Sequence, residues 1–332
     1  MAAIETFALE KSYRVGFWRS TVKQALRPLT LAVSEGEIFG YLGPNGAGKT
    51  TTLKLLMGLV FPTGGHARIL GLPLDDPRMK AQIGFLPEQP YFYDYLTARE
   101  LLHYYAQLSG VPARERNRRV AAVLARVGLG SVGLQLRKFS KGMLQRVGIA
   151  QAIVHDPKLV FLDEPMSGLD PVGRREVRDL IQSLKEEGKT VFFSTHILSD
   201  AETLCDRVAV LNQGELRGIG VVADLANQLS GQVELLWQGD HMALAPLAAD
   251  ARSTGDLVRA VLPEAQLDNA LACLLRSHAR LISVTPVRST LEDYFLARLA
   301  DGAKSQTLPC LSNSLNDAEP RSRAGKTEVT SS

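Results

Sequence analysis

One stretch decides the fold of this chain: Ile38-Phe39-Gly40-Tyr41-Leu42-Gly43-Pro44-Asn45-Gly46-Ala47-Gly48-Lys49-Thr50. It opens as a short apolar strand, and after it Leu53, Leu56 and Met57 recur at helical spacing. The loop between them fits G-x-x-x-x-G-K-[ST], in which main-chain N–H groups and a helix N-terminus hold phosphate oxygens. The stretch therefore predicts a strand, a phosphate-binding loop and a helix over residues 50–59.

Two residues of this loop carry a charge and a hydroxyl. Lys49 is predicted to contact the β- and γ-phosphates of a nucleotide, and Thr50 to offer its hydroxyl to Mg²⁺. The alternative is a glycine-rich loop without a ligand. The strand before the loop and the helix after it argue against that alternative.

Two further apolar runs extend a sheet. Leu159-Val160-Phe161-Leu162 is continuously apolar, as in a strand buried on both faces, and Thr190-Val191-Phe192-Phe193-Ser194 has the same character. Helical patterns alternate with these strands, which predicts an α/β fold with a mostly parallel sheet. Ligands of such sheets bind at the carboxyl ends of the strands.

The remaining sequence predicts the domain organisation. Residues from about 97 to 154 have mainly helical patterns, and after Gly220 the pattern changes to short α and β segments such as the alternating run Gln232–Trp237. We expect one large unit over residues 4–224, with a helical subdomain at about 90–155, and a small α+β domain over 225–299. Residues 300–332 lack periodicity, which predicts a disordered tail.

Composition excludes several classes of protein. The 332 residues carry a net charge of +3, which does not favour nucleic acid as a partner. The three cysteines lie far apart and form no CxxC pair, which fits a reducing compartment. Because no apolar run reaches the roughly 18 to 20 residues of a membrane span, and no secretory signal is present, we expect a cytoplasmic chain.

Polar residues at two strand ends predict the chemistry. Asp163 and Glu164 follow the strand ending at Leu162, and His196 follows the strand ending at Thr195. Asp163 is predicted to hold Mg²⁺, Glu164 to polarise the attacking water as general base, and His196 to reach a γ-phosphate oxygen. Without other motifs, two acidic residues after an apolar strand more often mark a solvated strand end, and a single histidine is more often structural. Because a phosphate-binding loop precedes them in this chain, we prefer the functional interpretation for Asp163, Glu164 and His196.

A further motif identifies the family. Phe139-Ser140-Lys141-Gly142-Met143 precedes a helical run, for which Ser140 is a suitable N-cap. With Gln145-Arg146, the strand ending in Asp163-Glu164, Ser167-Gly168-Leu169-Asp170 and His196, it resembles the signature motif of the ABC ATPase family. This order of motifs covers residues 4 to 220.

The resemblance implies the architecture, the cofactors and a second subunit. It implies a RecA-like P-loop NTPase core with an antiparallel β subdomain and an α-helical subdomain, and it implies ATP and Mg²⁺ as cofactors. In that family two cassettes sandwich each ATP, so this chain is expected to form a homodimer or to pair with a closely related second ATPase subunit.

The resemblance also implies roles for single residues. Ser140 and Gly142 would contact the γ-phosphate bound by the partner's Lys49, and Asp170 would couple the two sites. Tyr13 is similar to the family's adenine-stacking aromatic, with an ordinary half-buried tyrosine as the alternative. The ATP-binding residues would be Gly43, Pro44, Asn45, Gly46, Ala47, Gly48, Lys49, Thr50 and Thr51.

Two departures from the family pattern point to a subfamily. The signature carries Lys141 and Met143, and Glu88 stands where the family has glutamine, with Gln89 following as the alternative. Glu88 is expected to bind Mg²⁺ or to orient water. Both departures, together with Ser289–Phe295, resemble ABC-2 type exporters. Their ATPase subunits lie on the inner face of the membrane, bound to separate integral membrane permease subunits.

A soluble ATPase and a regulatory switch are the alternatives to an exporter subunit. A soluble ABC-type ATPase of translation carries two cassettes, and one of DNA maintenance carries long coiled coils, whereas this chain has one cassette and no such coil. A regulatory switch can dispense with the general base that Glu164 would provide. We also expect a long connection over residues 15–27, with Arg19, Lys23 and Arg27, as either a membrane or permease contact or a solvated loop.

Overall fold

The computed structural model describes residues 1–16, 21–227, 231–239, 244, 251–277, 279–286, 291–292 and 294–295. Its centre is a six-stranded sheet of order β10-β9-β3-β8-β7-β6. The pairs β9·β3, β3·β8, β8·β7 and β7·β6 are parallel, and β10 pairs with β9 antiparallel. The mostly parallel sheet predicted from the sequence is therefore confirmed. Its strands are β3 (Ile38–Leu42), β6 (Ile83–Leu86), β7 (Leu159–Asp163), β8 (Thr190–Thr195), β9 (Arg207–Asn212) and β10 (Glu215–Val221).

The central strands are apolar throughout because both faces of the sheet are covered. Along β8, Val191 and Phe193 pack into the core on one face, with the helices, and Phe192 packs into the core on the other. The Phe192 ring lies 5.5 Å from that of Phe39 and 5.3 Å from that of Tyr41, between ring centres. A strand buried in this way shows no polar alternation.

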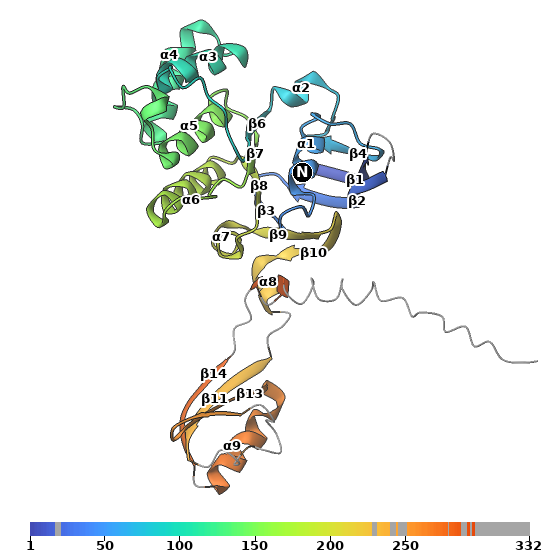
Figure 1. Ribbon diagram of the computed structural model, residues 1–332, viewed down its shortest axis with the longest axis vertical. Coiled ribbons are helices and arrows are strands. Elements are labelled where there is room, and N and C mark those ends of the chain that lie inside the picture. Colours follow the sequence, from blue (N-terminus) through green and yellow to red (C-terminus); the bar gives the residue numbers. More distant parts are fainter. Residues whose placement is uncertain are drawn as a thin grey trace, which may run out of the picture.

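A four-stranded antiparallel sheet of order β2-β1-β4-β5 forms a second layer beside α1. Figure 1 shows it on the opposite side of the central sheet from α3, α4 and α5. Its strands are β1 (Ala2–Val15), β2 (Thr21–Ser34), β4 (Gly64–Ile69) and β5 (Leu72–Pro73).

The prediction of a long connection over residues 15–27 is wrong. Strands β1 and β2 continue to the end of the hairpin, where Tyr13 pairs with Lys23 and Val15 with Thr21. Residues 16–20 alone join the strands, and 17–20 lie outside the described residues. The first four residues of β2 are all exposed, so this part of the strand lacks the alternation that marks a half-buried strand.

The helices of the central unit begin and end near the positions that the sequence predicts. Helix α1 covers Lys49–Leu56, three residues shorter at its end than expected, and Gly58 follows in the left-handed conformation at φ 63°. The helical pattern over 97–154 corresponds to α3, α4 and α5. The others are α2 (Pro77–Lys80), α3 (Ala98–Leu108), α4 (Ala113–Arg126), η1 (Leu136–Lys138), α5 (Lys141–Ile153), α6 (Pro171–Glu186) and α7 (Leu198–Leu204).

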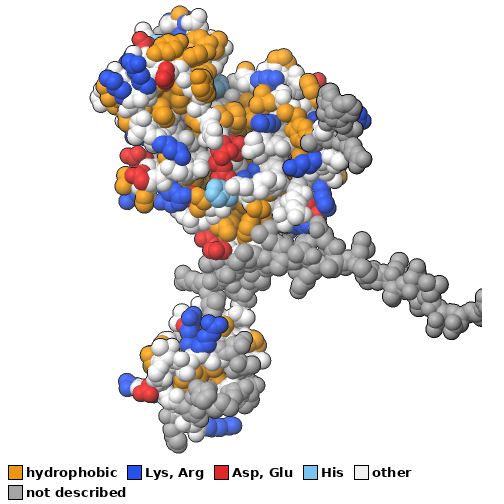
Figure 2. Space-filling view, viewed as in Figure 1, with side chains coloured by type: hydrophobic (Ala, Val, Ile, Leu, Met, Phe, Trp, Pro, Cys, Tyr) orange, Lys and Arg blue, Asp and Glu red, His pale blue; other side chains and the backbone are white. Residues whose placement is uncertain are grey.

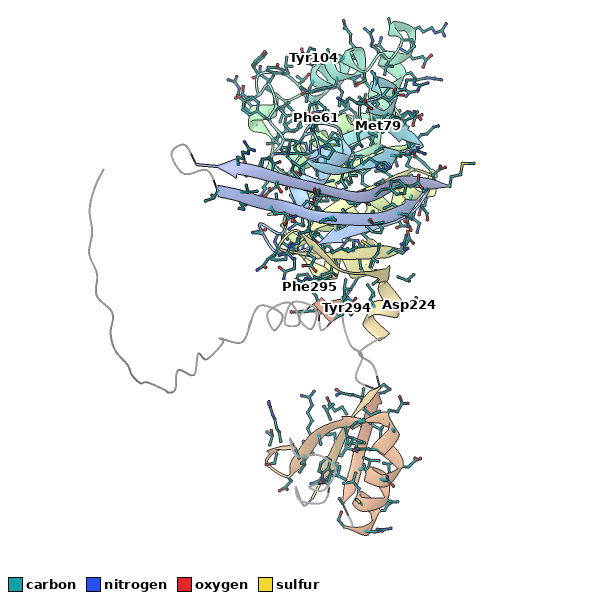
Figure 3. All side chains as sticks on the ribbon, turned by 90° about the vertical axis from the view of Figure 1, so that its right-hand side faces the viewer. Phe61, Met79, Tyr104, Asp224, Tyr294 and Phe295 are labelled. Atoms are coloured by element: carbon teal, nitrogen blue, oxygen red, sulfur yellow. The ribbon has the colours of Figure 1, made fainter. Side chains whose placement is uncertain are left out.

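A smaller unit follows α8 (Val222–Asn227). It has a four-stranded antiparallel sheet of order β12-β13-β11-β14 with α9 on one face (Figures 1 and 3), and Trp237 lies fully buried in its core. The predicted strand Gln232–Trp237 is β11. The elements are β11 (Gln232–Gln238), β12 (Arg252–Thr254), β13 (Leu257–Pro263), η3 (Glu264–Gln266), α9 (Leu267–Arg276) and β14 (Arg280–Pro286). No helix within the described ranges is long and apolar enough to cross a bilayer.

Candidate functional site

The phosphate-binding loop joins β3 to α1 in a geometry that requires glycine. Gly48 is the N-cap of α1 at φ 107°, and a Cβ there would lie 2.5 Å from the carbonyl oxygen of Ala25. A Cβ on Gly43 would lie 2.5 Å from the carbonyl oxygen of Leu211. A side chain at Gly43 or Gly48 would collide with main-chain atoms of neighbouring strands. The loop can therefore adopt this conformation only with glycine at both positions.

Lys49 holds its ammonium group inside this loop. Its Nζ donates to the carbonyl oxygens of Gly43 at 2.6 Å and Pro44 at 3.3 Å. The same Nζ lies 3.3 Å from Glu164 Oε1, and both side chains are 7% exposed. The pair holds the Lys49 ammonium at the loop, where phosphate oxygens would bind, and the Glu164 carboxylate compensates its charge.

Ser194 connects the two carboxylates that follow β7. Its Oγ donates to Asp163 Oδ1 at 2.5 Å and accepts from the Glu164 main-chain N–H at 3.2 Å. The two strands are neighbours, with Asp163 paired to Ser194 in the parallel register. The contact fixes Asp163 at the sheet edge that faces α1.

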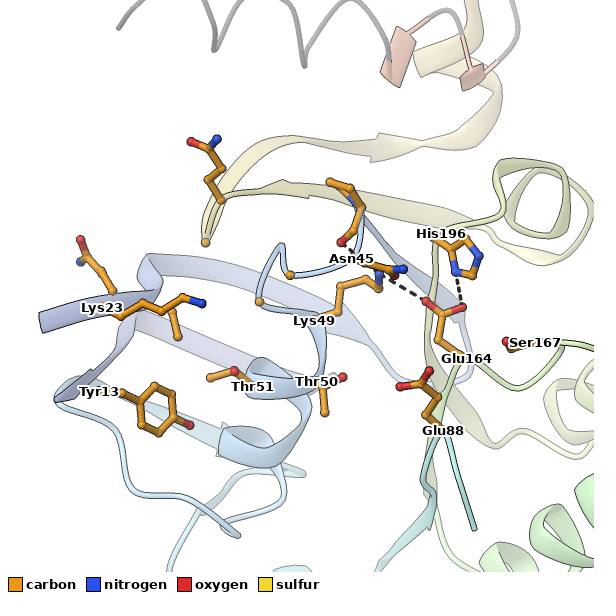
Figure 4. A pocket seen from close by; sticks show the side chains of 17 residues that line it. Tyr13, Lys23, Asn45, Lys49, Thr50, Thr51, Glu88, Glu164, Ser167 and His196 are labelled. Carbon is orange, nitrogen blue, oxygen red and sulfur yellow. Dashed lines mark hydrogen bonds and ion pairs between the residues drawn. The ribbon is translucent and has the colours of Figure 1, made fainter. Parts of the chain in front are cut away.

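Glu164 lies between a cation and an imidazole. Its Oε2 is 2.9 Å from Nδ1 of His196, and its Oε1 faces Lys49 and accepts no hydrogen bond from the described residues. His196 is 42% exposed on its side chain, whereas Glu164 is buried. Figure 4 shows the row Lys49, Glu164, His196 along one wall of the cavity. A buried carboxylate oriented by a histidine is the arrangement that a general base requires.

These residues line a cavity of about 880 Å³. Figure 2 shows acidic side chains and a histidine gathered at the centre of this face. The cavity brings together eleven of the predicted site residues, from the hairpin, the phosphate loop, the Glu88 segment and the two strand ends. They are Tyr13, Pro44, Asn45, Gly46, Gly48, Lys49, Thr50, Thr51, Glu88, Glu164 and His196.

Glu88 rather than Gln89 faces the cavity (Figure 4). Tyr13 lies at the opposite end from Glu164, with the Lys11 ammonium 5.1 Å from the centre of its ring. Tyr13 is 36% exposed and lines the cavity.

Several predicted residues lie elsewhere in the chain. Ser140 caps α5 by accepting from Met143 N at 3.2 Å, and Asp170 caps α6 by accepting from Gly173 N at 2.9 Å. These two are not among the described residues that line the cavity, and neither are Gly43, Ala47, Gln89, Gly142 and Asp163.

Sequence reasoning missed other lining residues. Lys23, Gln24 and Ala25 come from the hairpin that was expected to be a loop, and Gln213 and Gly214 come from the turn between β9 and β10. Ser167 lies in the turn after β7 and belongs to a motif for which the sequence predicts no role at this cavity. None of these lining residues carries a local signal, because the packing of distant segments brings them to the cavity.

The donors suit a magnesium nucleotide. Thr50 offers a hydroxyl, while Asp163 and Glu88 offer carboxylates, the oxygen ligands that Mg²⁺ prefers. Asp163 is 2% exposed and directly precedes Glu164, which lines the cavity, and a cation would offset the burial of its carboxylate. The residues present therefore fit the metal.

The chain is similar to known ATP-binding proteins. The model of the family described as ABC transporter matches residues 26–167. An uncharacterized ABC transporter ATP-binding protein of Synechocystis sp. is 46% identical over 301 residues, which is 90% of this chain and 85% of the relative. The linearmycin resistance ATP-binding protein LnrL of Bacillus subtilis is 32% identical over 82% of this chain and 93% of its own.

A solved structure extends this likeness. It is described as the dimeric post-hydrolysis state of an ATP-binding cassette bound to ADP and Pi, and it has a TM-score of 0.59 and 28% sequence identity. The likeness covers 66% of this chain and 98% of that chain.

Proposed function

Because this chain belongs to the ABC transporter family as an ATP-binding protein, we propose that it powers a separate membrane permease by hydrolysing Mg-ATP in a two-copy assembly. ATP hydrolysis is the activity of the chain as a member of that family. The observation that supports the proposal most directly is the row of Lys49, Glu164 and His196 along the cavity wall.

ATP binding follows from the shape and charge of the cavity. The loop N–H groups and Lys49 would hold the phosphates, and Tyr13 would stack on the base at the other end. Thr50, Asp163 and Glu88 would hold Mg²⁺, which neutralises phosphate charge when it is bound. Ser194 supports this set by keeping the Asp163 carboxylate in place at 2.5 Å.

Hydrolysis would proceed through Glu164. Its Oε1 can accept a proton from a water molecule as the water oxygen attacks the γ-phosphorus. The bond from that phosphorus to the β–γ bridging oxygen breaks and ADP leaves, while Lys49 stabilises the charge on the transferred phosphoryl group. His196 holds the other carboxylate oxygen at 2.9 Å, which fixes the direction of Oε1. Its exposed ring edge is then available to a γ-phosphate oxygen.

A second copy would complete each site. Ser140 and Gly142 stand at the N-terminus of α5, which has thirteen residues, and Asp170 stands at the N-terminus of α6. Both positions lie outside the cavity of their own chain, so they would serve the ATP of the partner in an isologous pair. The dimeric cassette bound to ADP and Pi supports this arrangement.

The transport role rests on the relatives. The similarity to a linearmycin resistance ATP-binding protein supports export of a compound by an ABC-2 type system. The subunit would then lie at the inner face of the cell membrane, bound to integral permease subunits.

The catalytic proposal is tested with Glu164→Gln. The amide keeps the size of the side chain but cannot accept a proton as a base, so turnover should fall by at least about 100-fold. ATP should still bind, and the variant should run as a dimer on size-exclusion chromatography with Mg-ATP. Lys49→Ala is the control, since it should lose ATP binding and stay monomeric. Unchanged turnover of Glu164→Gln would remove Glu164 from the mechanism.

The transport proposal is tested on the native assembly. The tagged chain is purified from membranes in mild detergent, and the co-purifying proteins are identified. A multi-span protein in near-equal amount is expected. Recovery with ribosomes, with DNA or alone would leave the ATPase chemistry intact and overturn the transport role.

A further inference from the structure

The chain returns to the ATPase unit after the C-terminal sheet. Leu291 and Tyr294, which follow β14 in the sequence, are 0% and 3% exposed. They pack in one apolar cluster with residues of β3, α7, β9 and α8, namely Leu42, Ala201, Val208, Val210 and Leu225. Figure 3 shows Tyr294 and Phe295 beside Asp224 of α8. We call Leu291, Glu292, Tyr294 and Phe295 the return segment.

Gly218 leaves the space into which Tyr294 fits. A Cβ on Gly218 would lie 2.3 Å from the Tyr294 hydroxyl oxygen and 3.2 Å from the ring carbon that carries it. The register of β9 with β10 shifts between Leu216 and Gly218, so the strand is irregular where the tyrosine docks. The missing side chain of Gly218 and the irregular strand together leave room for the tyrosine ring, and we call this contact the seat of Tyr294.

A hydrogen bond attaches the return segment to α7. The main-chain N–H of Leu291 donates to Glu202 Oε1 at 2.6 Å. Ala201, the neighbour of Glu202 on the same helix, packs in the apolar cluster with Leu291 and Tyr294. The return segment therefore holds α7 by both a polar and an apolar contact.

Helix α7 begins beside the reacting groups. It starts at Leu198, directly after His196 and Ile197, and His196 Nδ1 lies 2.9 Å from Glu164 Oε2. The apolar cluster also includes Leu42, the residue before the phosphate loop. A shift of α7 moves the backbone from which His196 projects.

We propose that the return segment positions α7, and through it His196, for ATP hydrolysis, with Tyr294 and Glu202 as positioning residues. The inference rests on the proposed role of His196 and Glu164. The alternative is that the segment covers an apolar patch and contributes to stability alone.

The first test measures kcat and KM for ATP in the full chain. Tyr294→Ala and Glu202→Ala should lower kcat by about ten-fold, because small displacements of oriented groups are costly to rate. KM should stay near the wild-type value, since the phosphate loop is intact. Glu292→Ala, an exposed position in the same segment, is the matched control and should match wild type. A lowered melting temperature with unchanged kcat would overturn the proposal.

The second test uses the seat itself and does not depend on the stability of Tyr294→Ala. Gly218→Ala should lower kcat, because the new methyl group collides with the tyrosine hydroxyl. Adding Tyr294→Phe removes the atom at 2.3 Å and leaves the ring carbon at 3.2 Å, so activity should recover in part. Absence of recovery in a folded double variant would contradict the positioning role.

The third test asks whether the effect passes through His196. In a His196→Ala background with measurable residual turnover, Glu202→Ala should cause no further loss. A loss of the same size as in wild type would overturn the path through His196. Failure of Glu164→Gln to reduce turnover would instead reject the proposed catalytic role, whatever the return segment does.

Discussion

Glu164 has a backbone conformation that few side chains adopt. Its φ is 49°, in the left-handed region, directly after the last residue of β7. Such a conformation costs on the order of 1 kcal/mol for a residue with a Cβ. The Glu164 N–H donates to Ser194 O and to Ser194 Oγ, each at 3.2 Å, and these contacts hold the turn. The turn directs the carboxylate toward Lys49 and His196.

Ser194→Ala is the prediction at this scale. The variant removes the donor to Asp163 Oδ1 and the acceptor of the Glu164 N–H, and it leaves a buried carboxylate without its partner. We expect a loss of about 1–3 kcal/mol in stability and a fall in kcat of roughly ten-fold or more. Steady-state ATPase assays and thermal unfolding measure both. Ser199→Ala, an exposed serine on α7, is the control, and equal behaviour of the two variants would contradict the role of Ser194.

At the scale of elements, α7 is held from two sides. The return segment contacts one side, and on the other the buried Asp200 carboxylate lies 3.6 Å from Arg178 Nη1 of α6. Neither carboxylate oxygen accepts a hydrogen bond from the part of the chain that the structure describes. Burial raises the pKa of Asp200, and the charges of Arg174 and Arg178 offset only part of that shift. Helix α6 begins at the Asp170 cap, so this contact joins the proposed partner-facing helix to the helix after His196.

Asp200→Asn should therefore change how stability depends on pH. Because the raised pKa belongs to the folded state, the folded protein binds a proton at Asp200 more tightly than the unfolded protein does. Stability is lost as pH rises from the ordinary value of 3.8 through the raised one. The amide does not titrate, so the melting temperature of Asp200→Asn minus that of wild type should be larger at pH 7.5 than near pH 4.

The control for that comparison is Asp179→Asn, which removes one exposed carboxylate from α6, the helix that faces Asp200. It separates the effect of burial from that of net charge. A difference between Asp200→Asn and wild type that stays constant with pH would contradict the burial argument.

At the scale of the whole molecule, the C-terminal sheet has a core of its own. Trp237, Leu235 and Val233 of β11 pack with Ala270 and Leu274 of α9 in a cluster separate from those of the ATPase unit. Figure 1 shows this unit apart from the central sheet. A core of this kind can unfold as a unit.

Trp237→Ala tests this independence. Removing a fully buried tryptophan should cost about 3–5 kcal/mol within its core. Calorimetry should then show a transition at lower temperature that Mg-ATP does not shift, and a second transition that Mg-ATP raises, because the ligand stabilises only the unit that binds it. Leu275→Ala, an exposed position on α9, is the control. One joint transition that Mg-ATP shifts as a whole would show that the two units unfold together.

Local patterns in the amino-acid sequence are enough to predict several parts of this protein. The strand Ile38–Leu42, the phosphate loop and the start of α1 follow from periodicity and from a motif within neighbouring residues, as does the strand that ends in Asp163. The cap Ser140 is local for the same reason, since a cap bonds to an N–H within one helical turn. The register of the family motif predicts Glu88 rather than Gln89 as the site residue, and Glu88 lines the cavity.

Which distant residues meet depends on how the strands and helices pack against one another. The strand order β3-β8-β7 brings Lys49 to Glu164 and Ser194 to Asp163, and pairing registers carry no signal in a single strand. The exposed end of the β1–β2 hairpin escaped prediction because its main-chain pairing needs no apolar alternation. The contact of Tyr294 with Gly218 could not be predicted either. A glycine in the sequence shows that a side chain is missing, but it does not show which residue fills the space. Contacts of this kind arise from packing between segments far apart in the chain, which local periodicity does not encode.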